Sequence, residues 1–327
     1  MLFLAIVAPS YVLGQAAPPP TLMIIDVDQG LFYARDTPDW TKYATERGPV
    51  REVQGVRNFW AWEGIGDIVA VGGRRMRGTW HSRAVQINMS PNPAGGAAIA
   101  DVSRGGTLEW IMEILDLEGN RIGSIMGYGW QGGAAPAGGE RMEGLELAIT
   151  GGTGAYVGIR GQMASNRERT GAPAYRGNAS MVEDPAHRRD NGAGQTRRHV
   201  LQVWPPAQAT IERVLHGDFS PVTAASPARP GETLILMCAN LGPVRPNVPF
   251  GQAFPEAPYA EVNAPVDVVV NGESYGAINK LGVPGQTNLY RVDIALPATI
   301  AVGEATIEVR PAFLNGQSMR IPVAAAR

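Results

Sequence analysis

Apolar and polar residues alternate with a period of two through most of the chain, and runs with the 3.6-residue spacing of a helix are almost absent. Alternation interrupted by Gly, Pro and Asn is typical of β-strands that bury one face. The clearest case is a hairpin in which residues 107–117 form a long strand, Glu118, Gly119 and Asn120 turn, and residues 121–130 return. The pattern therefore predicts an all-β protein.

Two groups of strands lie on either side of Trp204, Pro205 and Pro206. Many consecutive strands in the first group favour a closed antiparallel barrel of eight strands, assigned to residues 18–205. The strands expected there lie at 53–62, 68–72, 78–88, 107–117, 121–130, 142–150, 155–163, 174–182 and 197–204.

Residues 206–327 carry shorter strands, which predict an immunoglobulin-like β-sandwich. The Pro-rich stretch at 242–265 is expected to be a loop without regular structure. A length of 327 residues exceeds what one core usually holds, in agreement with two domains. The strands expected in this half lie at 211–215, 233–239, 266–271, 274–280, 289–296, 304–310 and 317–323.

The first residues suggest export. Residues 1–17 begin with an apolar run too short for a membrane-spanning helix, which needs about 20 residues, and end in small residues before Pro18. This pattern fits a signal peptide, although the usual basic start is missing. The alternative is an apolar N-terminal strand. Export predicts an extracytoplasmic protein, secreted or at the cell surface.

Composition excludes several function classes. A net charge of −2 does not favour nucleic-acid binding. A single cysteine, Cys238, rules out an internal disulfide and any multi-cysteine metal site. The four histidines are far apart in the sequence, so no metal and no cofactor is expected.

The C-terminal half resembles an uncharacterised family, the Solibacter-type C-terminal domain of exported acidobacterial proteins. The resemblance covers about 207–327 and implies an immunoglobulin-like fold, export and an accessory role, without supplying catalytic residues. It rests on four spaced elements: Asp218-Phe219-Ser220-Pro221, Ala228-Arg229-Pro230-Gly231-Glu232, Leu241-Gly242-Pro243, and Tyr290-Arg291-Val292 before Pro297.

The N-terminal half resembles the allene oxide cyclase and dirigent barrel superfamily. The motif is ITGGTGAYVGIRGQ at 149–162. The resemblance implies a barrel, and no catalytic position of that superfamily can be matched here. Gly151, Gly152, Thr153 and Gly154 also resemble a nucleotide-binding loop, but a strand rather than a helix is expected to follow, so we interpret them as a tight turn.

Candidate chemistry lies on the long hairpin. Glu109 and Glu113 share one strand face, and Tyr128 lies on the returning strand. If that face points inward, the carboxylates line a barrel pocket and can transfer protons, with Arg160 and Arg83 as counter-charges.

The alternative is that Trp110, Met112 and Ile114, on the opposite strand face, fill the barrel while the carboxylates face water. The hydrophobicity of these three residues favours this alternative. It leaves Ile111 and Leu115 on the outside, where the second domain could cover them.

Three functions remain open. The first is a non-enzymatic surface accessory protein that binds a small hydrophobic ligand. The second is a cyclase-like or dirigent-like enzyme that acts on a hydrophobic substrate in the barrel. The third is a structural surface or filament component, and homo-oligomers or attachment to the cell surface would be compatible with it.

Overall fold

All regular elements in the described part of the chain are β-strands, which confirms the all-β prediction. The computed structural model describes residues 20–35, 59–87, 105–131, 145–165, 174–176, 184, 195–204 and 208–325. The expected signal peptide and the expected junction at 205–206 lie outside these residues.

Eight antiparallel strands close into a barrel, as predicted, because β1 pairs with β10 on one side and with β2 on the other. Two short strands, β3 (Arg74–Arg75) and β9 (Ala174–Arg176), pair with β2 and β1. In their order around the barrel, the eight strands are β2 (Phe59–Val71), β4 (Arg77–Ile87), β5 (Gly105–Leu115), β6 (Arg121–Gln131), β7 (Leu145–Gly154), β8 (Arg160–Ser165), β10 (Gln195–Trp204) and β1 (Thr21–Arg35).

The sequence pattern did not predict strand β1. Its alternation is regular from Thr21 to Val27, but the register with both neighbouring strands then shifts before Gly30 and Leu31. Gln29 adopts a φ of 57° within this irregularity. An extra residue in a strand breaks the period of two, so the apolar residues after it no longer continue the pattern.

The described parts of the strands expected at 53–62 and 68–72 belong to one continuous strand, β2, which runs from Phe59 to Val71, and residues 53–58 lie outside the described residues. Gly64, between the two expected strands, lies inside the barrel, where a Cβ atom would come within 2.7 Å of Phe32 and 2.8 Å of Ser82. The ring of Trp80 lies 3.0 Å from the same point. This glycine therefore makes room for aromatic side chains in the core rather than ending the strand.

The prediction of a tight turn at residues 151–154 is wrong, because the turn follows these residues instead of containing them. Strand β7 continues through Gly151 to Gly154, and residues 155–158 make the turn before β8. The backbone N–H of Tyr156 donates to the carbonyl of Thr153, and Gly154 has a φ of 63°. The strand expected at 155–163 begins only at Arg160, as β8. Because a strand and not a helix follows this turn, the motif lacks the helix N-terminus of a nucleotide-binding loop.

Residues 208–325 form two further antiparallel sheets. The segment expected as one strand at 274–280 divides between them, because β16 pairs in one sheet and β17 in the other. The loop expected at 242–265 contains two short strands, β13 and β14. One sheet has the order β11 (Thr210–His216), β12 (Thr233–Ala239), β18 (Leu289–Ala295), β17 (Asn279–Gly282), β14 (Glu261–Val262), β13 (Val244–Arg245), and the other β16 (Glu273–Gly276), β15 (Val266–Val270), β19 (Gly303–Pro311), β20 (Ser318–Val323).

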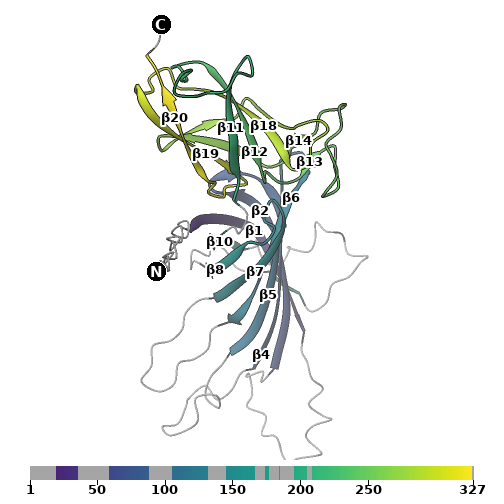
Figure 1. Cartoon of the computed structure of the whole chain (residues 1–327). Helices are drawn as coiled ribbons and strands as arrows, with labels where there is room; N and C mark the ends of the chain where they lie inside the picture. The colour runs from purple at the N-terminus through teal and green to yellow at the C-terminus, as the bar shows by residue number, and fades with distance from the viewer. Residues whose placement is uncertain are drawn as a thin grey trace, which may run out of the picture.

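These two sheets sit on one end of the barrel, as Figure 1 shows, and buried side chains of both parts belong to one continuous hydrophobic cluster. Polar contacts cross the junction: the backbone N–H of Asn315 donates to Thr21 Oγ1 at 3.0 Å, and Arg74 forms an ion pair with Asp267 at 2.6 Å. In the part of the chain that the structure describes, no helix is long and apolar enough to span a membrane.

Candidate functional site

The residues proposed from the sequence to line a barrel pocket lie on its outer face. Arg83, Glu109 and Tyr128 stand side by side on β4, β5 and β6, and all three are exposed, Tyr128 by 51%. Glu63 lies opposite Arg83 on β2. The inward-facing hypothesis is therefore wrong for these residues, which form an outer row in which Arg83 stands between two carboxylates.

The other two candidates are equally remote from the barrel interior. Glu113 is partly exposed, opposite Thr79 and Ser124 on the neighbouring strands. Arg160 is exposed, and its Nη1 donates to the carbonyl of Ile159 at 2.9 Å. The five proposed residues thus do not converge on a common site.

The alternative face of the hairpin fills the barrel instead. Trp110, Met112 and Ile114 are each no more than 2% exposed. Trp110 lies across Gly127 on the next strand, where a Cβ atom would come within 2.5 Å of the indole ring. Because neighbouring residues of a strand point to opposite faces, Glu109 and Glu113 face outward when these large side chains face inward.

The barrel interior also contains a buried polar and aromatic cluster. The guanidinium of Arg197 lies 4.5 Å from the ring centre of Phe32 and 5.1 Å from that of Trp80. Its Nε donates to Gln195, and Trp80 stacks on His199. Cations over aromatic faces are stabilised by the ring quadrupole, so these contacts stabilise the packing of this buried cluster.

A pocket of about 290 Å³ lies between the barrel and the second part of the chain. The barrel contributes the turn after the glycine motif, including Ala155, Tyr156 and Val157. The approach is close, since a Cβ atom on Gly242 would come within 2.8 Å of Ala155. Ligand sites in proteins often form where two domains meet, and this volume is near the lower end of their range.

Aromatic side chains from the second part form much of the opposite wall. The rings of Phe254 and Tyr290 lie 5.1 Å apart, and the Tyr290 hydroxyl donates to the carbonyl of Gly242 at 2.8 Å. A turn from Pro249 to Gln252 places Phe250 at the pocket, where its ring is 82% exposed. An exposed aromatic ring beside an apolar pocket costs little to desolvate and gains contact area when a ligand covers it.

The polar groups of the pocket are all uncharged. Asn240 and Asn288 pair with each other, because the Asn288 Nδ2 donates to Asn240 Oδ1 at 2.8 Å and the Asn240 backbone N–H donates to Asn288 Oδ1. The side chains of Gln252 and Thr287 make no hydrogen bond to described residues. The pocket can therefore supply hydrogen bonds to a ligand but no charge to pair with one.

Tyr156 is the most deeply buried polar residue of the pocket lining. It is fully buried, and its hydroxyl has no hydrogen-bond partner among the described residues. Burial raises the pKa of this phenol above its usual range, so the hydroxyl is neutral at every physiological pH. A neutral phenol is a hydrogen-bond donor, not a base.

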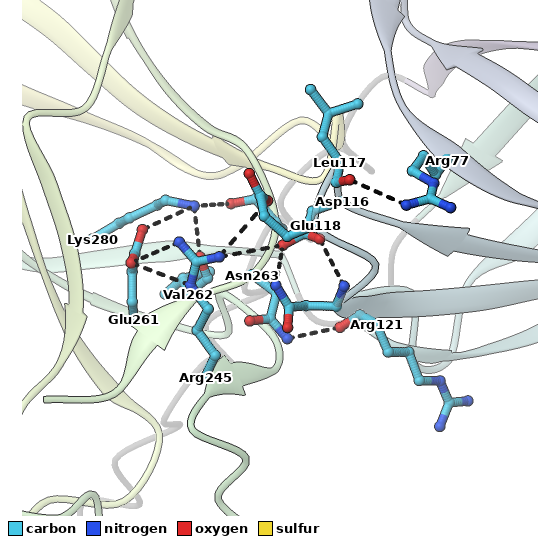
Figure 2. A network of polar contacts seen from close by, with 12 residues as sticks. Arg77, Asp116, Leu117, Glu118, Arg121, Arg245, Glu261, Val262, Asn263 and Lys280 are labelled. Atoms are coloured by element: carbon cyan, nitrogen blue, oxygen red, sulfur yellow. Dashed lines mark hydrogen bonds and ion pairs between the residues drawn. The ribbon is translucent and has the colours of Figure 1, made fainter. Parts of the chain in front are cut away.

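A polar network holds the two parts together (Figure 2). Arg245 Nη2 lies 3.0 Å from Glu261 in its own domain, and Nη1 lies 3.7 Å from both Asp116 and Glu118 in the turn between β5 and β6. Beside it, Asn263 Nδ2 donates to the carbonyl of Arg121 at 2.9 Å. The barrel hairpin predicted from the sequence therefore serves as a docking element for the second domain.

Lys280 is a partly buried member of the same network. Its Nζ donates to the carbonyls of Val262 and Ala264 at 2.6 and 2.9 Å, and lies 3.9 Å from Glu261. Burial lowers the pKa of this ammonium, the nearby Arg245 lowers it further, and Glu261 opposes the shift. The neutral amine still has two N–H donors for the two carbonyls.

We expect the stability contributed by Lys280 to rise with pH. Because the folded protein holds this proton less tightly than the unfolded chain does, raising the pH from below the folded pKa towards the unfolded value of 10.5 favours folding. The free energy of unfolding of the parent protein minus that of Lys280→Met should therefore increase over this alkaline range in urea denaturation. A difference that is flat or falls with pH would contradict the depressed pKa.

Among the described residues, no group of three or more His, Cys, Asp or Glu side chains could hold a metal ion. Cys238 is buried, and its pKa is raised to about 12 by burial, with a smaller effect of Glu212. The thiol is therefore a small core residue.

The pocket itself was not found from the sequence. Its residues come from the turn after the glycine motif and from three separate stretches near 240–254, 287–290 and 314. One signal was present: the exposed aromatic Phe250 within a Pro-rich and Gly-rich loop. Comparison with protein-family models, curated proteins and solved structures gives no match for this chain.

Proposed function

We propose that this protein binds a small, uncharged and largely apolar molecule in the pocket between its two parts. The observation that carries the proposal is the lining, which combines four aromatic rings with amide and hydroxyl groups and contains no charged side chain. Binding a charged ligand there would leave its charge without a partner in a desolvated site. An aromatic ligand with one or two hydrogen-bonding groups satisfies both parts of the lining.

The pocket supports binding rather than catalysis. Its titratable groups are Tyr156 and Tyr290, and burial raises the pKa of both phenols, that of Tyr290 to about 12. Neither phenol can act as a base near neutral pH. The cyclase-like alternative depended on Glu109 and Glu113 inside the barrel, and their outward positions remove its support.

We also propose that the protein is exported and that residues 208–325 are an immunoglobulin-like accessory domain. The apolar start of the chain and the resemblance of the C-terminal half to a family of exported proteins support this proposal. The arrangement of that half in two antiparallel sheets is compatible with it. In this view the accessory domain also completes the ligand pocket, because it supplies most of the lining.

A pair of dyes with the same aromatic body tests the proposed binding. We expect neutral N-phenylnaphthylamine to bind with increased fluorescence, and anionic anilinonaphthalene sulfonate to bind more weakly. Val157→Trp, at a pocket residue that is 61% exposed, should raise the Kd of the neutral dye about tenfold, or by 1.4 kcal/mol, since the indole occupies ligand space.

The matched control is Val302→Trp, because Val302 is 64% exposed and does not line the pocket. This substitution adds the same side chain to the surface and should leave dye binding unchanged. Equal affinities of the two variants for the neutral dye, or a preference of the parent protein for the sulfonate, would overturn the proposal.

A further inference from the structure

A second feature, which shares no residue with the pocket, lies at the edge of the six-stranded sheet. His216 is the last residue of β11, Ser226 lies in the connection that follows, and Glu232 immediately precedes β12. Strands β11 and β12 are antiparallel neighbours, and His216 stands opposite Leu234. The connection therefore returns to its starting point and brings the three side chains together.

The imidazole of His216 links the other two side chains. Its Nδ1 lies 3.3 Å from Glu232 Oε2, and its Nε2 lies 3.2 Å from Ser226 Oγ. Each ring nitrogen thus faces a different group, in the order carboxylate, imidazole, hydroxyl. This is the arrangement by which a histidine removes the proton of a serine while a carboxylate fixes its tautomer and stabilises the cation that forms.

The carboxylate of Glu232 is held on both oxygens. Oε1 accepts the backbone N–H of Arg229 at 2.9 Å, while Oε2 faces the histidine. These two contacts restrict the rotation of the carboxylate and fix its orientation towards the histidine. Asp218 adds a second negative charge near the ring, since its own pKa is lowered in part by His216 after the larger effect of Ser220.

The loop that carries the serine is also fixed. The backbone N–H of Ser226 donates to the carbonyl of Thr223 at 3.1 Å, and that of Thr223 donates to the carbonyl of Ser226 at 2.9 Å. The Ser226 carbonyl oxygen lies 3.1 Å from His216 Nε2 as well. Once Nε2 has taken up the serine proton, this carbonyl oxygen can accept a hydrogen bond from it.

The serine is more exposed than the histidine and the glutamate, as nucleophilic catalysis requires. The side chains of His216 and Glu232 retain 14% and 24% of their exposure, whereas Ser226 is exposed on a bend. The base and the carboxylate are thus shielded from water, while the hydroxyl is accessible to a reagent from solution. An exposed bend restricts the acceptor to small molecules that need no deep binding cleft.

We propose that Ser226 is a nucleophile that cleaves small carboxylic esters, with His216 as the base and Glu232 as a positioning residue. The Ser226 Oγ forms a bond to the ester carbonyl carbon as His216 Nε2 takes the hydroxyl proton. The carbon–oxygen bond to the alcohol then breaks, and Nε2 returns the proton to the leaving alkoxide. Water attacks the acyl-serine by the same route, releases the carboxylic acid and restores the hydroxyl.

The test is covalent labelling of the full chain with a fluorophosphonate, with the modified residue located by mass spectrometry, together with hydrolysis of p-nitrophenyl acetate. We expect labelling at Ser226 and its loss in Ser226→Ala. The control is Ser220→Ala, because Ser220 is a partly exposed serine whose hydroxyl donates directly to the Asp218 carboxylate at 2.6 Å, with no histidine between them. This variant should keep the parent rates.

Variants of His216 and Glu232 distinguish a catalytic role of these two residues from a purely structural one. His216→Ala should lower the labelling rate about 10²-fold, the usual contribution of a general base. Glu232→Gln should lower it as well, and Glu232→Asp should restore part of it at an unchanged melting temperature. Absence of label on Ser226, or labelling that is insensitive to both the histidine and the glutamate variants, would overturn the proposal.

Discussion

Trp110→Ala is expected to destabilise the barrel by about 3 kcal/mol. Removing a large buried aromatic side chain usually costs about 3–5 kcal/mol, since transfer energy is lost and a cavity remains. Part of this cost is offset here, because the indole Nε1 is buried without a hydrogen-bond partner among the described residues. Urea denaturation followed by circular dichroism measures the change.

The neighbouring substitution Glu109→Ala is the control for this prediction. Glu109 precedes Trp110 on the same strand but faces solvent, so its removal should change the free energy of unfolding by less than about 0.5 kcal/mol. The comparison distinguishes the two faces of the strand directly. A larger loss at Glu109 than at Trp110 would mean that the carboxylate face points into the barrel.

Gly154→Ala is expected to cost about 3 kcal/mol, because two penalties combine at this position. The residue has a φ of 63°, which side chains disfavour, and an added Cβ atom would come within 2.3 Å of the Ile122 carbonyl and 2.9 Å of the Gly123 Cα. Both obstacles are backbone atoms, which cannot rotate away. The same denaturation experiment measures the loss.

Gly119→Ala separates these two penalties. Gly119 also has a positive φ, of 92°, but an added Cβ atom there meets nothing within 4 Å. Gly119→Ala should therefore lower the free energy of unfolding only by the conformational cost of about 1–2 kcal/mol. If the two glycine variants lose equal stability, the steric contact of an added Cβ atom with β6 does not contribute to the loss at Gly154.

Together, the pocket and the polar network describe one junction with two roles. Arg245 and Asn263 hold the second part of the chain against the barrel hairpin, and the turn at 155–158 meets the aromatic wall beside Tyr290. Because both parts line the pocket, a ligand that binds there also stabilises their contact. The ligand binding that we propose is therefore expected to strengthen the docking of the two parts.

The strand positions with regular alternation were predicted well. Thr233–Ala239 matches the prediction in both bounds, and β5 and β6 differ from it by one or two residues. Failures occur where local geometry interrupts the period of two. The irregularity near Gln29 interrupts the alternation of β1, and the buried Gly64 lies between the two segments that were expected as separate strands. In both cases the cause is a tertiary contact or a bulge, not the intrinsic preference of the residues.

The candidate site could not be predicted in the same way. The sequence placed Glu109 and Glu113 on one face of a strand and Trp110 on the other, and left two orientations. Packing decided between them, because Trp110 has a complementary Gly127 on the neighbouring strand. A glycine paired across strands with a tryptophan is visible only when the register is known.

By itself, the sequence determined the all-β class, the barrel, the division into two parts and the absence of a multi-cysteine site, because these follow from local periodicity and composition. Only the tertiary structure decided which strand face is inside, where the pocket lies and which residues meet. Those properties depend on pairing register and on contacts between distant segments, such as Tyr156 with the aromatic wall, or His216 with Ser226 and Glu232. Such contacts arise from the packing of the whole chain and leave no periodic signal along it.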